Sequence, residues 1–139
     1  MEAQNIGLKM SELTKALGNK LIVRFMEEAE FSMENYFILN ILYERDNVIQ
    51  HDLAEVLKKD KSAVLRQIDF LEMKKLVVRI SDTEDRRKKT ITLTKNGVNV
   101  IQKLRKIEVD VINGLLEGIP KNDLDIFFSV LERMKSKVV

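Results

Sequence analysis

The stretch that decides the fold runs from Asp60 to Leu93 and reads DKSAVLRQIDFLEMKKLVVRISDTEDRRKKTITL. Its first part has apolar residues every three or four positions, a spacing that predicts an amphipathic helix over 61–74. The apolar residues on the inner face are Val64, Leu65, Ile68 and Leu71. Its second part changes to β-prone runs at 76–80 and 90–94, joined by a polar loop over 81–89. This part predicts a β-hairpin.

A shorter helix is predicted just before this stretch, over 50–57. Its inner face carries Leu53, Val56 and Leu57. Only Lys58, Lys59 and Asp60 connect it to the next helix, and Asp60 is of a residue type that caps free N–H groups at a helix start. Two helices joined by so short a turn make a helix-turn-helix, here 50–74, and the hairpin over 76–94 adds a wing.

Longer segments with helical apolar spacing flank this winged unit. They predict helices over 7–28, 33–44, 95–117 and 121–137. Ser32 and Thr94 precede two of them and are suitable N-caps. The predicted fold class is therefore mainly α with a small β-hairpin, a winged helix-turn-helix, in a single domain over 1–139.

The composition excludes several kinds of protein. The chain has no cysteine and one histidine, His51, which excludes disulfides, thiolate metal sites and a histidine-rich metal site. His51 fits either a phosphate contact or an exposed side chain without a partner. There is no apolar run of the roughly 20 residues that cross a membrane, and no secretory pattern at the N-terminus, so we expect a cytoplasmic protein. We find no phosphate-binding loop and no nucleophile with a base, and expect neither an enzyme nor a cofactor or metal.

The positive charge is concentrated in the middle of the chain. The formal net charge is +2, but residues 58–89 alone carry +5, which leaves −3 for the rest. A basic segment of this kind is typical of a nucleic-acid-binding surface.

Two groups of residues in this segment could contact DNA. On the 61–74 helix, Lys61, Ser62, Arg66 and Gln67 lie opposite the apolar face. Arg pairs well with guanine and Gln with adenine in the major groove, although a charged outer face is also what a merely solvated helix has. In the hairpin loop, Arg86, Arg87, Lys88 and Lys89 follow Asp85. A loop arginine can enter a narrow minor groove, with Asp85 pairing with it to fix its direction, whereas the alternative is a disordered basic loop without a target.

Five short motifs in this order carry a resemblance to a known family. They are Leu53-Ala54-Glu55, Lys61-Ser62-Ala63-Val64, Leu71-Glu72, Asp85-Arg86-Arg87 and Leu93-Thr94-Lys95-Asn96-Gly97. With the flanking helices, nearly the whole chain resembles the MarR family of bacterial transcriptional regulators.

The resemblance implies a homodimeric regulator of transcription. Helices 7–28 and 95–137 would form the dimer interface, and 33–94 would be the lobe that binds a pseudo-palindromic operator on double-stranded DNA. Lys61, Ser62, Ala63, Arg66 and Gln67 would lie on the recognition helix; Asp85, Arg86, Arg87 and Lys88 would form the wing tip. Arg87 would reach the minor groove. The resemblance further implies a repressor controlled by a small ligand between the dimer helices and this lobe, although the sequence identifies no ligand-binding residue.

The chain departs from the family at two positions. Lys75 stands where the family usually has glycine, at a left-handed helix end, so either the lysine accepts a cost of about 1 kcal/mol or the helix ends differently. Ile49 stands where the family tends to have a hydroxyl residue, which leaves the cap of the 50–57 helix open.

The outer helices carry more apolar surface than one chain needs. Phe25, Phe127, Phe128, Leu131 and Met134 are the main examples. Packing within the chain and pairing with a second copy both explain them, and we expect both in part. A different class of function remains as the alternative, in which the winged helix is a protein–protein interaction module and its basic wing binds an acidic partner.

Overall fold

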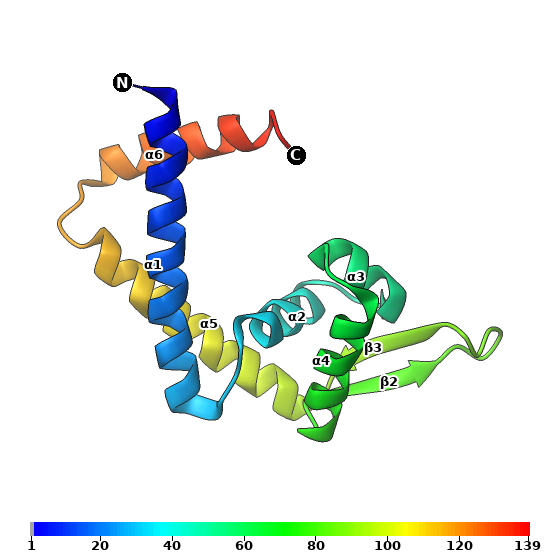
Figure 1. Cartoon of the computed structure of the whole chain (residues 1–139). Helices are drawn as coiled ribbons and strands as arrows, with labels where there is room; N and C mark the ends of the chain where they lie inside the picture. The colour runs from blue at the N-terminus through cyan, green and yellow to red at the C-terminus, as the bar shows by residue number, and fades with distance from the viewer. Residues whose placement is uncertain (1) are drawn as a thin grey trace. The chain divides into compact units, whose positions relative to one another are not determined.

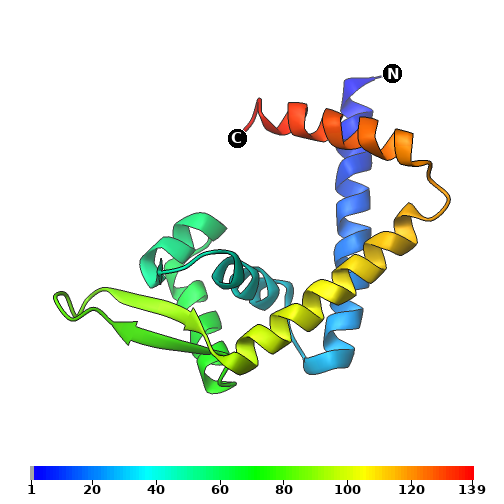
Figure 2. The same ribbon diagram turned by 180° about the vertical axis from the view of Figure 1, so that it is seen from behind.

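The computed structural model describes residues 2–139, which form six α-helices and a three-stranded antiparallel sheet (Figures 1 and 2). The chain divides into two compact units, Met1–Glu108 and Val109–Val139. The first contains α1 (Ala3–Ala29), α2 (Met33–Glu44), β1 (Val48–Ile49), α3 (Gln50–Leu57), α4 (Lys61–Met73), β2 (Val77–Ser81) and β3 (Lys89–Leu93). Helix α5 (Lys95–Leu116) begins in the first unit and ends in the second, which also contains α6 (Lys121–Lys135). The predicted fold class is confirmed, and the largest boundary difference is at α1, which begins four residues earlier than predicted.

Helices α3 and α4 form the predicted helix-turn-helix. Helix α3 is followed by Lys58, whose φ of 52° is left-handed. At its other end, Ile49 occupies the N-cap position and makes no side-chain hydrogen bond to the helix. Asp60 caps α4 as predicted, because its carboxylate accepts a hydrogen bond of 3.3 Å from the N–H of Ala63. Leu53 and Ile68 are fully buried and belong to the common core of the two helices.

The wing is the antiparallel pair β2 and β3, which projects from α3 and α4 in both views (Figures 1 and 2). Val77 pairs with Leu93 near its base and Ser81 with Lys89 near its tip. Strand β1, which the sequence analysis missed, pairs with β3 and makes the order β1-β3-β2. Two residues are too few for a period-2 pattern, so β1 left no signal in the sequence.

The end of α4 resolves the question raised by Lys75. Lys75 is left-handed, with φ of 61°. Its N–H bonds to the carbonyl of Glu72 at 2.9 Å, and the N–H of Leu76 bonds to the carbonyl of Leu71 at 3.0 Å. This is the Schellman ending, which usually has glycine at the left-handed position. The helix therefore ends as in the family, with lysine accepting the less favourable backbone conformation.

The start of α5 is held against the same turn. Thr94 caps α5 as predicted, since its hydroxyl accepts a 3.0 Å hydrogen bond from the N–H of Gly97, and it also donates to the carbonyl of Lys75 at 2.7 Å. A Cβ atom on Gly97 would overlap the carbonyl of Leu76. The glycine of the Leu-Thr-x-x-Gly motif is thus required by a close approach between α5 and the turn that leads into β2.

Three apolar residues of the helices show which faces the core covers. Val56 is 43% exposed although Leu53, one turn earlier, is fully buried, so its prediction as an inner residue is wrong. Phe37 is 45% exposed, since it lies two residues, or about 200° of helix turn, from the buried Leu39. Phe25 is fully buried within its own chain, and its ring centre lies 5.0 Å from that of Tyr36.

Helix α6 has no buried residue, so the second unit by itself does not cover the apolar face that the sequence predicts to be buried. Phe127 and Phe128 are 49% and 58% exposed. Gly118, with φ of 80°, lies in the turn between α5 and α6. Across residues 2–139, the helices are all too short or too polar to cross a membrane.

Candidate nucleic-acid interface

The N-terminal half of α4 presents polar side chains on the face opposite its core residues. Lys61, Ser62 and Arg66 are exposed, whereas Ala63 and Gln67 are half-buried. Val64 and Ile68 are buried on the other side. The free N–H groups and the helix dipole at this end favour an anion such as a phosphate, and one α-helix fits a DNA major groove.

Gln67 has a structural contact that the sequence analysis missed. Its side-chain carbonyl accepts a hydrogen bond from the amide of Asn35, which is only 3% exposed. The other end of Asn35 accepts a bond of 3.1 Å from the N–H of Ser32, whose hydroxyl accepts from the N–H of Asn35 at 3.1 Å. This capping box at the start of α2 therefore extends to α4, and the carbonyl of Gln67 is engaged by Asn35 while its NH₂ group takes no part in the bond.

The tip of the wing is a turn built around Asp85. The carboxylate of Asp85 accepts a hydrogen bond of 3.0 Å from the backbone N–H of Arg87. Its carbonyl accepts another of 3.0 Å from the N–H of Lys88. Within the described part of the chain, Asp85 forms no ion pair with Arg86 or Arg87. It orders the turn through the backbone instead of through a guanidinium group.

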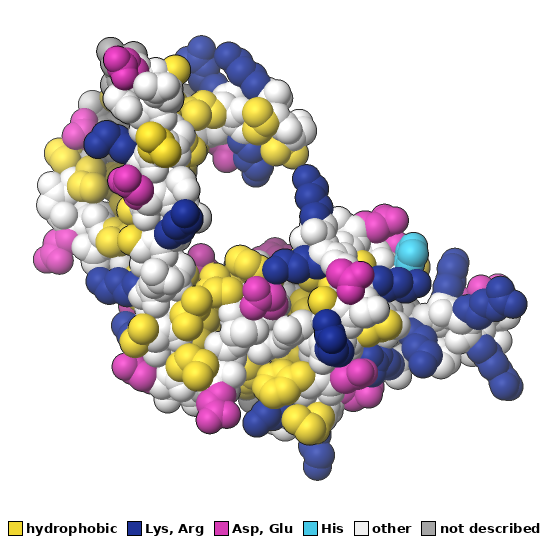
Figure 3. Space-filling view, in the orientation of Figure 1, with side chains coloured by type: hydrophobic (Ala, Val, Ile, Leu, Met, Phe, Trp, Pro, Cys, Tyr) yellow, Lys and Arg dark blue, Asp and Glu magenta, His cyan; other side chains and the backbone are white. Residues whose placement is uncertain are grey.

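The basic side chains of the wing are all free to approach a ligand. Arg86, Arg87, Lys88 and Lys89 are exposed. Figure 3 shows Lys and Arg side chains gathered at the end of the hairpin. The arrangement places a cluster of positive charge at the end of a projecting two-stranded arm, as a contact to nucleic acid requires.

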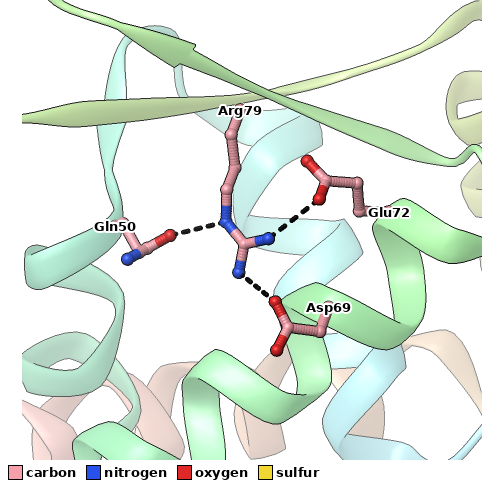
Figure 4. A network of polar contacts seen from close by, with 4 residues as sticks. All are labelled: Gln50, Asp69, Glu72 and Arg79. Carbon is pink, nitrogen blue, oxygen red and sulfur yellow. Dashed lines mark hydrogen bonds and ion pairs between the residues drawn. The ribbon is translucent and has the colours of Figure 1, made fainter.

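Arg79 joins the wing to both helices of the helix-turn-helix (Figure 4). Its Nε donates to Gln50 at the start of α3 at 2.8 Å. Its two terminal nitrogens donate to Asp69 and Glu72 of α4 at 2.6 and 3.0 Å. In the sequence, Arg79 is one of the positive charges of residues 58–89. Side chains alternate along a strand, and this alternation is the signal that could have predicted that Arg79 faces the helices.

Two further pairs of charged or ionisable side chains lie around the motif. Lys59 lies 3.5 Å from Glu34, and the pKa of Glu34 is lowered by the backbone N–H at the start of α2 and by Lys59. His51 is exposed and lies 3.8 Å from Glu55. Residues 2–139 contain no group of three His, Asp or Glu side chains that could hold a metal ion.

Known proteins are similar to this chain both over the helix-turn-helix and wing and over nearly its whole length. Residues 31–89 match the model of the MarR family. This matched segment begins two residues before α2 and ends at the first residue of β3, so it contains α4 and the wing tip. The predicted resemblance to the MarR family is confirmed.

Two curated relatives come from Bacillus subtilis (strain 168). The uncharacterized HTH-type transcriptional regulator YdgJ is 29% identical over 86% of this chain and 74% of its own length. The uncharacterized HTH-type transcriptional regulator YxaD is 28% identical over 100% of this chain and 99% of its own. The crystal structure of the S. aureus MepR–DNA complex superposes with a TM-score of 0.79, at 22% identity, over 99% of both chains. At this identity the superposition shows a shared fold.

Proposed function

We propose that this chain is a sequence-specific regulator of transcription that binds double-stranded DNA as a homodimer and represses from a pseudo-palindromic operator. The observation that carries the proposal is that one compact unit presents both an exposed polar helix start and a projecting basic wing. The curated relatives that are named HTH-type transcriptional regulators support it. This role belongs in the cytoplasm, as predicted.

The recognition helix α4 would enter the major groove. Arg66 is exposed and can read guanine with two hydrogen bonds. Lys61 and Ser62 at the helix start suit phosphates, and Ala63 suits a thymine methyl group. Gln67, held by Asn35, would use its remaining NH₂ group.

The wing would contact the neighbouring minor groove. Arg87 would insert, and Arg86 and Lys88 would pair with flanking phosphates. Asp85 contributes by holding the turn through the N–H of Arg87. A helix in the major groove and an arginine in the minor groove together read more of one half-site than either element alone.

The exposed apolar surface supports the homodimer. Phe127, Phe128 and Ile126 of α6 are each about half exposed or more, and α1 exposes Leu8 and Leu13 to a similar extent. A second copy would cover such surfaces, which water contacts at a cost of roughly 25 cal/mol per Å². Two-fold pairing would also present two recognition helices to half-sites about 34 Å apart.

A small ligand could control this binding. A hollow of about 220 Å³ lies between α2, α3 and α4, and both Ala63 and Gln67 border it. A ligand there would lower DNA affinity only by favouring a position of α4 that differs from the DNA-bound one. This site lies inside the DNA-binding lobe, in contrast to the predicted position between the lobe and the dimer helices.

Selection of bound genomic fragments by the purified protein tests the proposed function. We expect one enriched palindromic sequence, together with weaker binding to any duplex that falls steeply as salt rises. The matched control is the same protein with Arg86, Arg87 and Lys88 replaced by Gln. Equal recovery of all fragments, or no salt-dependent binding, would contradict the proposal and favour the alternative of an acidic protein partner.

A further inference from the structure

We propose that Arg79 is a positioning residue for DNA binding, which sets the direction of the wing relative to the recognition helix α4. The inference rests on the proposed function and adds a residue that need not touch DNA. It concerns the means by which two separate contact elements, α4 and the wing tip, are held at one spacing.

The hydrogen bonds of Arg79 define its geometry. The guanidinium group is planar, and three of its five N–H donors are occupied by acceptors on two helices. Gln50 lies on one side of the group, and Asp69 and Glu72 lie on the other (Figure 4). Anchors on opposite sides fix a planar group in both position and rotation, which a single ion pair cannot do.

No other side-chain hydrogen bond within residues 2–139 joins the wing strands to α3 or α4. Packing on this face also ends close to Arg79: its partner across the pair, Ile91, is 2% exposed, whereas Ser81, the next residue of β2 on the same face, is exposed. Arg79 is therefore the outermost side-chain anchor of the wing, next to the backbone pairing of β1 with β3, which ends at Thr90. Everything beyond it, including Arg87, follows the direction set there.

The length of the hairpin amplifies any change at this anchor. About five residues of strand and loop extend beyond Arg79, or roughly 16 Å at the usual rise per residue. A rotation of about 10° at the anchor would move the tip by about 3 Å, the length of a hydrogen bond. Loss of the anchor would therefore separate the wing contact from the helix contact.

Arg79 is poorly placed to contact DNA itself. Its side chain is only 16% exposed, and its donors face carboxylates and an amide of the same chain. It also neutralises Asp69 and Glu72, which are 65% and 44% exposed. A direct phosphate contact, a charge effect and a positioning role make different experimental predictions.

The first measurement uses the free protein. Residual dipolar couplings of backbone amides in α4 and in β2–β3 report the relative orientation of the two elements. We expect one rigid orientation for the wild type and a loss of it in Arg79→Gln, with Lys95→Gln, an exposed lysine at the start of α5, unchanged as the control. A single unchanged orientation in Arg79→Gln would overturn the inference without bearing on DNA binding.

The second measurement is the affinity for a fixed duplex across a salt series. We expect Arg79→Gln to bind about tenfold more weakly than wild type, because α4 and the wing tip are no longer held at one spacing. The salt slope should not change, since no phosphate contact is lost; a slope smaller by about 0.9 per contact would mean direct binding and would overturn the inference. Thermal unfolding of every variant checks that the measurements are made on folded protein.

Two further variants separate position from charge. Arg79→Lys keeps the charge and loses the planar fork, so we expect it to remain weak. The triple variant Arg79→Gln, Asp69→Asn, Glu72→Gln removes the unpaired carboxylates, and we expect it to remain weak also. Full recovery of DNA affinity in either variant would show that charge alone matters and would overturn the inference. Absence of salt-dependent DNA binding by the wild type would overturn the proposed function instead. The orientation measurement would then decide the role of Arg79.

Discussion

The hydroxyl of Tyr36 donates a hydrogen bond to the carboxylate of Glu108, and this bond joins α2 to α5 within the first unit. Tyr36 is only 4% exposed and lies against the ring of Phe25. Burial, followed by the nearby Glu108 carboxylate, raises the pKa of Tyr36 above its ordinary value near 10. The folded protein therefore holds the phenol proton more tightly than the unfolded chain does.

The raised pKa predicts a loss of stability at alkaline pH. The stabilisation is fully present below pH 10 and is lost as pH rises toward the folded-state pKa, because the unfolded tyrosine then releases its proton first. Tyr36→Phe should unfold more easily at pH 7, by about 1–3 kcal/mol, since the acceptor at Glu108 loses its donor. Its free energy of unfolding should also fall less between about pH 9 and 11 (about one unit either side of the tyrosine value), as measured by urea denaturation. The exposed Tyr43→Phe is the control, and equal alkaline slopes for Tyr36→Phe and wild type would contradict the prediction.

Arg66 and Gln67 should differ although they are neighbours on α4. Arg66→Ala should relax base preference by about 1–3 kcal/mol at particular positions and leave stability nearly unchanged. Gln67→Ala should destabilise the protein by about 1–3 kcal/mol, because the buried amide of Asn35 loses its acceptor. Competition binding with mutated duplexes and thermal unfolding measure the two effects. A uniform loss across all duplexes for Arg66→Ala would indicate a phosphate contact instead.

Arg87→Ala should weaken operator binding while the dimer and its unfolding midpoint remain as in wild type. The physical reason is that an arginine in a narrow minor groove meets an enhanced negative potential. Fluorescence anisotropy with the operator duplex measures the affinity, and light scattering measures the dimer. Thr83→Ala in the same exposed loop is the control. Wild-type affinity in Arg87→Ala would rule out its role in the minor groove.

Asp85 should tolerate loss of its charge but not loss of its oxygen. Asp85→Asn keeps an acceptor for the N–H of Arg87, so the turn and the operator affinity should be retained or slightly improved as a negative charge is removed near phosphates. Asp85→Ala removes the acceptor and should weaken binding. The same anisotropy assay decides between the two roles: if Asp85→Asn binds as weakly as Asp85→Ala, an ion pair with an arginine holds the loop.

Lys75→Gly should stabilise the protein. The left-handed backbone at this position costs a lysine about 1 kcal/mol relative to glycine, and the two hydrogen bonds of the helix ending do not involve the side chain. Lys74→Gly is the matched control, because Lys74 has φ of −74° and should gain nothing. The urea midpoint measures both, and an equal or lower stability of Lys75→Gly would contradict this explanation.

The sequence by itself determined the order and kind of the helices, the wing, and the caps at Ser32, Asp60 and Thr94. These features depend on the spacing of apolar residues and on interactions between residues close together in the chain, so the local sequence is enough to predict them. The same holds for the basic loop and for the motifs that resemble the MarR family.

Only the tertiary structure decided which side chains hold these elements together. The bonds from Arg79 to Gln50 and Asp69, from Asn35 to Gln67 and from Tyr36 to Glu108 join residues 10 to 72 positions apart. Such partners are chosen by how helices and strands pack, and no local pattern encodes that choice. The sequence thus indicated which residues of α4 and the wing could face DNA, and the packing determined that Gln67 is partly committed elsewhere and that Arg79 joins the two contact elements.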